Sequence, residues 1–200
     1  ILGAGEEVKW ISGQTGIETG SPKLIREHMP GKCRPFKPED WPNVVVEAFE
    51  VLSRNDWVPC GTIILGLPGE DERDVELTID LIEQLRRFKS LIVPLFFVSM
   101  GSLEDSKSFG LDNLTPLHTE LLFKCWEHNF EWIPTLIEEY SEMTIRGSLK
   151  RTGLKLLVSA AISKSRSLMR KCREEYGCDL RKMAREYRAR RKGTLRRVVK

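Results

Sequence analysis

Several features that define other protein classes are absent from this sequence of 200 residues. No apolar run approaches the ~18 residues that a membrane-spanning helix needs, and the longest one covers residues 91–98. The first residues contain neither the basic nor the apolar segment of a secretory signal. The five cysteines are odd in number and irregularly spaced. They disfavour a disulfide framework and favour a reducing, cytoplasmic location.

Signatures of several enzyme classes are missing as well. The sequence has no G-x4-G-K-[ST] phosphate loop and no G-x-S-x-G nucleophile turn, which disfavours P-loop nucleotide hydrolysis and α/β-hydrolase chemistry. His28, His118 and His128 lie far apart and lack the spacing of zinc ligands, so we expect surface or packing roles for them. The 40% content of hydrophobic residues excludes wholesale disorder and predicts a globular chain.

The net charge of +3 conceals an uneven distribution. Residues 1–145 contain 13 Lys and Arg against 25 Asp and Glu, whereas residues 146–200 contain 19 against 4, a balance of +15. Such a basic segment suits the phosphates of RNA or an anionic membrane surface. Its only aromatic residues are Tyr176 and Tyr187, which is few for base stacking. The alternative is a solvated cationic face that packs against the acidic part of the chain.

The hydrophobic pattern predicts an α/β fold. Residues 58–65 and 91–99 are short apolar runs without polar alternation, as in strands that are covered on both faces. Residues 8–18 form a third expected strand. Apolar residues at helical spacing predict helices over residues 21–29, 40–55, 72–88, 115–143 and 152–171. The alternation of strands and helices predicts a parallel sheet with right-handed crossovers and at least one open edge.

We expect the chain to divide near residue 100. Residues 1–100 contain all three expected strands, whereas residues 101–200 show helical patterns and form a basic, α-helical C-terminal extension. The chain starts at Ile1 rather than at Met. We therefore expect that further strands of the sheet precede it in a longer protein.

Candidate ligand-binding residues lie at the carboxyl ends of the expected strands, where open α/β sheets and barrels bind their ligands. The first stretch is G-I-E-T-G-S-P, the second is G-T-I-I-L-G-L-P-G-E, and the third is the end of the strand over residues 91–99. The candidates are Glu18, Thr19, Ser21, Thr62, Ile64, Gly66 and Val98. The structural alternatives are an ordinary capping turn, a turn shaped by Gly and Pro, and a core strand.

Together, these stretches resemble the second half of a radical S-adenosylmethionine (radical SAM) domain, a partial, TIM-like (β/α) barrel. G-I-E-T-G-S-P-x-L-I is similar to the turn after its fourth strand, and T-I-I-L-G-L-P-G-E to its fifth-strand motif. The resemblance covers about residues 8–100 and is greatest to subfamilies with methylthiotransferases and cobalamin-dependent methylases. It implies an Fe–S oxidoreductase that cleaves S-adenosylmethionine reductively, with cobalamin as a further candidate cofactor of the longer protein.

The resemblance also implies roles for particular positions. Glu18 would contact the methionine amino group or the ribose of S-adenosylmethionine, and Thr62 would contact the ribose hydroxyls. The backbone from Ile64 to Gly66 and the side chain of Val98 would flank the adenine.

Three departures from the family pattern bear on these roles. Thr62 stands where Asp is common, and Pro30 stands where an Arg is expected. Lys32, with Arg34 nearby, would bind the methionine carboxylate as a point charge rather than a bidentate fork. No two cysteines have the C-x3-C or C-x2-C spacing of the cluster loop, and a [4Fe–4S] cluster needs converging thiolates.

The resemblance thus implies the C-terminal part of a radical SAM protein, whose N-terminal portion ligates the cluster and whose substrate the motifs do not specify. The alternative is a non-catalytic binding module that docks RNA or an anionic membrane through its basic helical tail.

Overall fold

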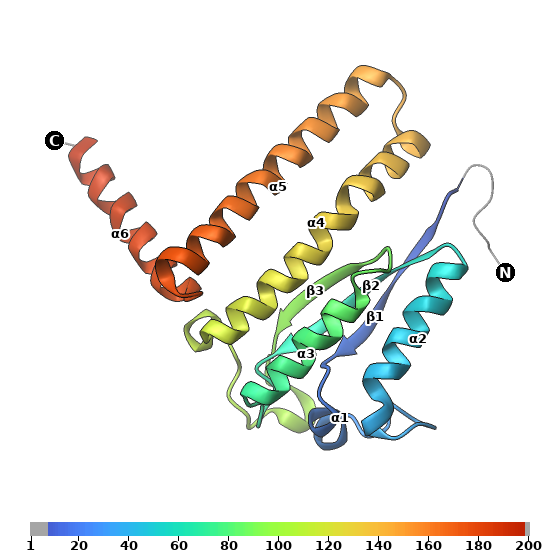
Figure 1. Ribbon diagram of the computed structural model, residues 1–200. Helices are drawn as coiled ribbons and strands as arrows, with labels where there is room; N and C mark the ends of the chain where they lie inside the picture. The colour runs from blue at the N-terminus through green and yellow to red at the C-terminus, as the bar shows by residue number, and fades with distance from the viewer. Residues whose placement is uncertain (1–7, 199–200) are drawn as a thin grey trace.

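The computed structural model describes residues 8–198, which form a three-stranded parallel sheet and six helices (Figure 1). The strands are β1 (Ile11–Glu18), β2 (Trp57–Leu65) and β3 (Leu91–Phe96), in the spatial order β1-β2-β3. The helices are α1 (Pro22–His28), α2 (Trp41–Arg54), α3 (Glu72–Leu85), α4 (Pro116–Thr144), α5 (Ser148–Tyr176) and α6 (Leu180–Val198). The predicted α/β class and the parallel pairing are confirmed, and the described strands form an open sheet rather than a closed barrel.

Local sequence signals set the starts of two helices beside the sheet. Ser21 caps α1, because its side chain accepts a hydrogen bond from the backbone N–H of Leu24, and Pro22 takes the first helical turn. Asp71 caps α3 and forms a reciprocal capping box with Asp74. The Ser21 cap that the sequence predicts is confirmed.

One face of the sheet carries the main hydrophobic core. Ile17, Ile63 and Ile92 contribute one side chain from each strand, and none is more than 1% exposed. They share a cluster with Phe49 of α2 and Leu81 of α3. Burial of an aliphatic side chain of this size contributes roughly 1.5–3 kcal/mol. Successive right-handed crossovers place both helices on this side of the sheet.

The opposite face, which we call the open sheet face, is only partly covered. It carries alternate residues of the strands: Gln14, Cys60, Thr62, Ile64 and Leu95. Gln14 is exposed, and Leu95 is 43% exposed. The expectation that the strand over residues 91–99 is covered on both faces is therefore wrong, because α2 and α3 lie on the other side. This strand also ends earlier than expected, at Phe96.

α4 runs along β3 and closes part of the outer edge of the sheet. The Asn129 side chain accepts a hydrogen bond from the backbone N–H of Ile92 at 2.8 Å and donates one to its carbonyl at 2.8 Å. Leu121 and Cys125 of the same helix belong to the sheet's core. The helix continues through Pro134.

α4 and α5 lie side by side as a long antiparallel pair, and α6 leads away from its end (Figure 1). Phe123, Met169 and Cys172 form a second, smaller core between these helices. In the part of the chain that the structure describes, no helix has both the length and the hydrophobicity needed to cross a membrane.

Candidate functional site

The end of β1 places two opposite charges next to each other. Glu18 closes the strand at a shift in the β1–β2 register and has a positive φ of 66°, a conformation that is costly for a residue with a Cβ. Its Oε1 atom accepts a hydrogen bond from Nζ of Lys32 at 2.8 Å. The Glu18 and Lys32 side chains are 17% and 30% exposed, respectively. The ion pair is therefore held in the fold but remains reachable from solvent.

Trp41 fixes the backbone on both sides of Glu18. Its indole N–H donates to the carbonyl oxygens of Ile17, at 3.2 Å, and Thr19, at 3.0 Å. The ammonium group of Lys32 lies 5.9 Å from the centre of the same indole, within the range of a cation–π contact. One buried side chain thus orients both members of the ion pair.

The ion pair lies over the open sheet face, beside Thr62. A Cβ atom built on Gly16 would lie 2.7 Å from Nζ of Lys32 and would collide with the Glu18 carboxylate. Gly16 is the β1 residue that pairs with Thr62 of β2, and cross-strand partners project to the same face. The structure therefore places Glu18 and Lys32 over the strand position that pairs with Thr62, and a shared role of the three in ligand binding stays a prediction.

Thr62 itself is 6% exposed. Its hydroxyl makes a long contact of 3.5 Å to the carbonyl oxygen of Thr15, which is weak by the usual distance criteria. The hydroxyl is thus not committed to a strong bond within the protein.

A hollow of about 320 Å³ continues this surface at the carboxyl ends of β2 and β3. Ile64 lies on the same face as Thr62, two residues further along β2, and shares the hollow with Val98. His28 closes one side, and its Nε2 atom lies 2.7 Å from the Pro68 carbonyl. The remaining lining is apolar and comes from Met29, Leu67, Leu95, Phe96, Phe97, Met100 and Leu103. The volume is at the lower end for small-molecule sites.

Gly66 differs from its predicted role. The position has a φ of +79°, and the space that a Cβ would take is filled by the ring of Phe109. The close approach that glycine permits is therefore made by the chain's own aromatic residue, which also packs edge-on against Phe96. In this arrangement no flat ligand lies directly on Gly66.

Glu70 and His118 are polar residues near the site that sequence reasoning missed. Oε2 of Glu70 accepts a hydrogen bond from the backbone N–H of Gly66 at 2.7 Å and lies 2.9 Å from Nε2 of His118. Nδ1 of His118 lies 2.7 Å from the Thr115 hydroxyl. This series of hydrogen bonds from Gly66 through Glu70 and His118 to Thr115 tethers the G-L-P-G-E loop to the start of α4. G-L-P-G-E marks Glu70, but no local signal links it to His118.

Thr19 and Ser21 are buried and serve the fold. The Ser21 hydroxyl donates to Oδ1 of Asp74 at 2.6 Å, and its backbone N–H donates to the Thr19 hydroxyl at 3.1 Å. The Thr19 hydroxyl also lies 3.1 Å from that of Thr78. Both side chains therefore fasten the β1–α1 turn to α3, and they lie at most 1% exposed.

The cysteines are not arranged to hold an iron–sulfur cluster. They belong to separate places: the α1–α2 connection (Cys33), β2 (Cys60), α4 (Cys125), α5 (Cys172) and the α5–α6 connection (Cys178). Burial raises the pKa of Cys60, Cys125, Cys172 and Cys178, which disfavours the thiolate that a cluster needs. Over residues 8–198, no group of three or more His, Cys, Asp or Glu side chains is placed to bind a metal ion.

Comparisons with known proteins assign this chain to no group. No family model matches it, and no curated protein matches it. The geometry at the strand ends is therefore the basis for the functional argument.

Proposed function

We propose that this chain forms part of the S-adenosylmethionine site of a radical SAM Fe–S oxidoreductase. The observation that carries the proposal is the Glu18–Lys32 ion pair, which lies over the sheet face that Thr62 shares. An amino acid is a zwitterion, and adjacent groups of opposite charge are its chemical complement.

The chemistry of S-adenosylmethionine fits the order of these groups. Its ammonium group would donate to the Glu18 carboxylate, and its carboxylate would accept from the Lys32 ammonium. The Thr62 hydroxyl would then contact the ribose, and the hollow between Ile64 and Val98 would take the adenine. Binding would exchange one internal ion pair for two ion pairs with the ligand, so both charges would stay paired.

The open sheet face supports a place for this chain within a partial barrel. Parallel sheets are normally covered on both faces. Here, Leu95 and Cys60 on the open sheet face remain partly exposed to solvent. In the proposed protein, further strands before this chain would complete the barrel around that face. Their cysteines would ligate the [4Fe–4S] cluster, which supplies the electron for reductive cleavage of the sulfonium. The residues of this chain bind and orient the ligand.

Isothermal titration of the chain with S-adenosylmethionine tests the proposal. We expect Glu18→Gln and Lys32→Gln each to weaken binding about tenfold or more, because each removes a charged hydrogen bond to the ligand. The control is Glu50→Gln, which breaks an exposed ion pair with Arg54 on α2 and leaves the affinity unchanged.

Adenosine and methionine, titrated separately, divide the site into its two parts. The Glu18 and Lys32 variants are expected to weaken methionine binding and leave adenosine binding intact. An unchanged affinity of either variant for S-adenosylmethionine, or no binding by the wild-type chain, contradicts the proposal.

A further inference from the structure

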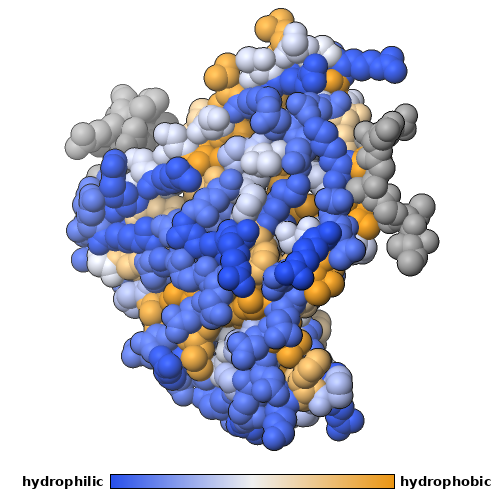
Figure 2. Space-filling model, turned by 45° about the vertical axis from the view of Figure 1, so that its right-hand side comes forward, coloured by the Kyte–Doolittle hydropathy of each residue, from blue (hydrophilic) through white to orange (hydrophobic). Residues whose placement is uncertain are grey.

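α5 carries a group of strongly exposed leucines. Leu149 is 85% exposed, Leu156 is 66% exposed and Leu157 is 72% exposed, and we call these three the leucine face. Their spacing of seven and eight residues places them on neighbouring parts of one helix surface. Hydrophobic atoms are visible at the top of the molecule in Figure 2, the end where Figure 1 places the α4–α5 connection.

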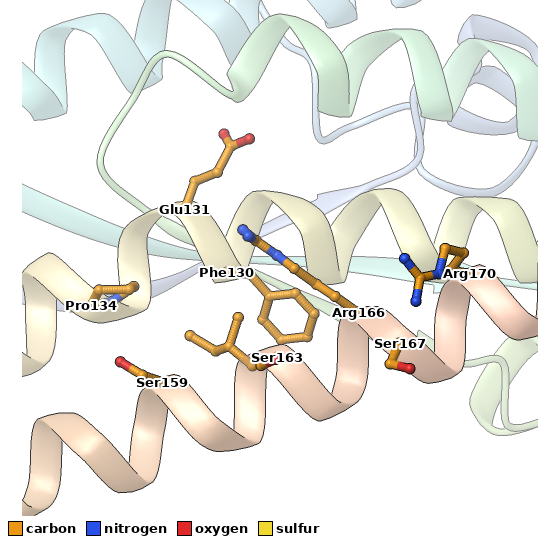
Figure 3. A pocket seen from close by; sticks show the side chains of 9 residues that line it. Phe130, Glu131, Pro134, Ser159, Ser163, Arg166, Ser167 and Arg170 are labelled. Carbon is orange, nitrogen blue, oxygen red and sulfur yellow. The ribbon is translucent and has the colours of Figure 1, made fainter.

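Further along α5, beyond the leucine face, a wide groove of about 920 Å³ lies between α4 and α5. Arg166 and Arg170 of α5 line it, together with the ring of Phe130 from α4 (Figure 3). The hydroxyls of Ser159, Ser163 and Ser167 recur every four residues along the same wall. The groove thus combines two guanidinium groups with hydroxyl donors, which are groups that bind phosphate oxygens.

Two of the nearby carboxylates, Glu131 and Glu127, are already paired with other cations. Glu131 contacts Arg86 of α3, and Figure 3 shows its side chain pointing away from α5. Glu127 contacts Arg173 at 2.7 Å, and Glu174 borders the adjoining hollow.

Neither Arg166 nor Arg170 makes an ion pair with a described carboxylate, although Lys155 and Arg173 of the same helix do. Both arginines are exposed. Ion pairs with the acidic part of the chain therefore neutralise some cations of the basic segment. Arg166 and Arg170 stay available to bind an anionic ligand.

The leucine face and the groove lie along one side of α5. Leu149, Leu156, Ser163 and Arg170 recur every seven residues, and this interval returns a helix to nearly the same side. Because a helix rises about 1.5 Å per residue, the line from Leu149 to Arg170 is roughly 30 Å long. A flat surface can touch both features at the same time.

We propose that this side of α5 docks on an anionic phospholipid surface. The leucine face enters the boundary between headgroups and acyl chains, and Arg166 and Arg170 bind lipid phosphates in the groove. The balance of +15 over residues 146–200 adds attraction to the same surface. Exposed leucines favour lipid over RNA, because RNA recognition uses stacking aromatic residues. The docking is independent of the S-adenosylmethionine site on the sheet.

Flotation with lipid vesicles tests the proposal. The probes are vesicles of phosphatidylcholine alone, vesicles of equal parts phosphatidylcholine and phosphatidylglycerol, and a short single-stranded RNA. We expect the full chain to float with the anionic vesicles and to bind neutral vesicles and RNA far more weakly. Leu156→Ser with Leu157→Ser is expected to weaken vesicle binding about tenfold or more, because apolar area is no longer buried. The control is Val51→Ser, which removes an apolar side chain of α2 that is 57% exposed.

A second pair of variants tests the groove. Arg166→Gln with Arg170→Gln is expected to weaken vesicle binding about 25-fold, which is about fivefold for each of the two basic residues near the surface. The control is Arg54→Gln with Arg73→Gln, which removes the same charge from α2 and α3. It is expected to change vesicle binding less than threefold, because salt screens charges that lie away from the lipid surface.

The substituted leucines and arginines are exposed, so equal melting temperatures are expected to show that the variants fold. Vesicle binding that the leucine substitutions leave unchanged, tighter binding to RNA than to anionic vesicles, or no vesicle binding overturns the proposal.

Discussion

His128 of α4 is a fully buried titratable side chain, at 0% exposure. Its Nε2 atom lies 2.9 Å from the Ser90 hydroxyl and 3.2 Å from the Ser90 carbonyl. The Ser90 hydroxyl donates to the carbonyl of Phe88, so the histidine Nε2–H is the donor to Ser90. Burial lowers the pKa of His128 to about 4, and the ring is therefore neutral in the folded protein near neutral pH.

This burial predicts a loss of stability in mild acid. Because the folded pKa lies below the unfolded value near 6.5, the unfolded chain takes up the proton first as the pH falls. His128 is expected to make the free energy of unfolding about 2 kcal/mol lower at about pH 5 than at about pH 7. Urea unfolding at both pH values measures the difference.

His128→Gln is expected to remove that part of the pH dependence while costing some stability at neutral pH. The same loss of stability in acid with and without His128 would assign it to other groups.

At the scale of elements, one buried carboxylate makes several of the contacts between the β1–α1 turn and α3. Asp74 is 3% exposed. Its oxygens accept from the Ser21 hydroxyl at 2.6 Å, from the Asp71 backbone N–H at 2.9 Å, and from Lys23 at 2.6 Å. The network holds the turn that directly follows Glu18, the last residue of β1.

Replacing this carboxylate is expected to loosen the whole turn. Asp74→Ala removes the acceptor of three hydrogen-bond donors and leaves the buried Ser21 O–H without an acceptor, so we expect the free energy of unfolding to fall by about 3 kcal/mol. Asp80→Ala, at an exposed position of the same helix, is expected to change it by less than about 0.5 kcal/mol. Chemical denaturation of both variants checks the difference, and similar values for the two would refute the role of Asp74.

Elements that local signals define were predictable from the sequence. The serine and proline at the start of α1, and the apolar spacing within α2 and α3, indicate the helices within a few residues. Contacts between distant parts of the chain were not predictable. The ring of Phe109 lies on Gly66, and Glu70 meets His118, although 48 residues separate that pair. Such contacts depend on how the loop after β3 folds back, which no short-range pattern records.

The candidate site shows the same division. The strand-end motifs point to Glu18 and Thr62, since the carboxyl ends of parallel strands meet at one edge, and the part of these two residues in binding stays a prediction. They also suggested Thr19 and Ser21, whose hydroxyls the structure shows to be used by Asp74 and Thr78. Residue type and spacing do not tell whether a hydroxyl faces a ligand or a neighbouring helix, because that depends on tertiary packing.

At the scale of the whole molecule, the sheet has helices over one face. The β3 residues Ile92 and Leu95 illustrate this asymmetry, since Ile92 is 0% exposed and Leu95 is 43% exposed. An uninterrupted apolar sequence is typical of a strand covered on both faces. In this chain, the apolar sequence of β3 instead places some of its side chains, such as Leu95, partly in contact with solvent.

This asymmetry predicts very different costs for the same substitution at the two positions. Leu95→Asp is expected to lower the free energy of unfolding by less than about 1 kcal/mol, because the carboxylate stays hydrated. Ile92→Asp is expected to lower it by about 4 kcal/mol or more, since the charge enters the core. Urea unfolding followed by circular dichroism compares the variants. An equally large loss for Leu95→Asp would mean that this face is covered after all.

The amide of Asn129 makes the two borders of the sheet unequal. By pairing with both backbone groups of Ile92, it occupies hydrogen-bonding positions that a neighbouring strand would need, much as a helix laid over an edge does. Growth of the sheet is thereby directed to the β1 border. Any segment that extends this sheet would join on the side from which the polypeptide enters, and the order of strands in a larger assembly would follow the order of the chain.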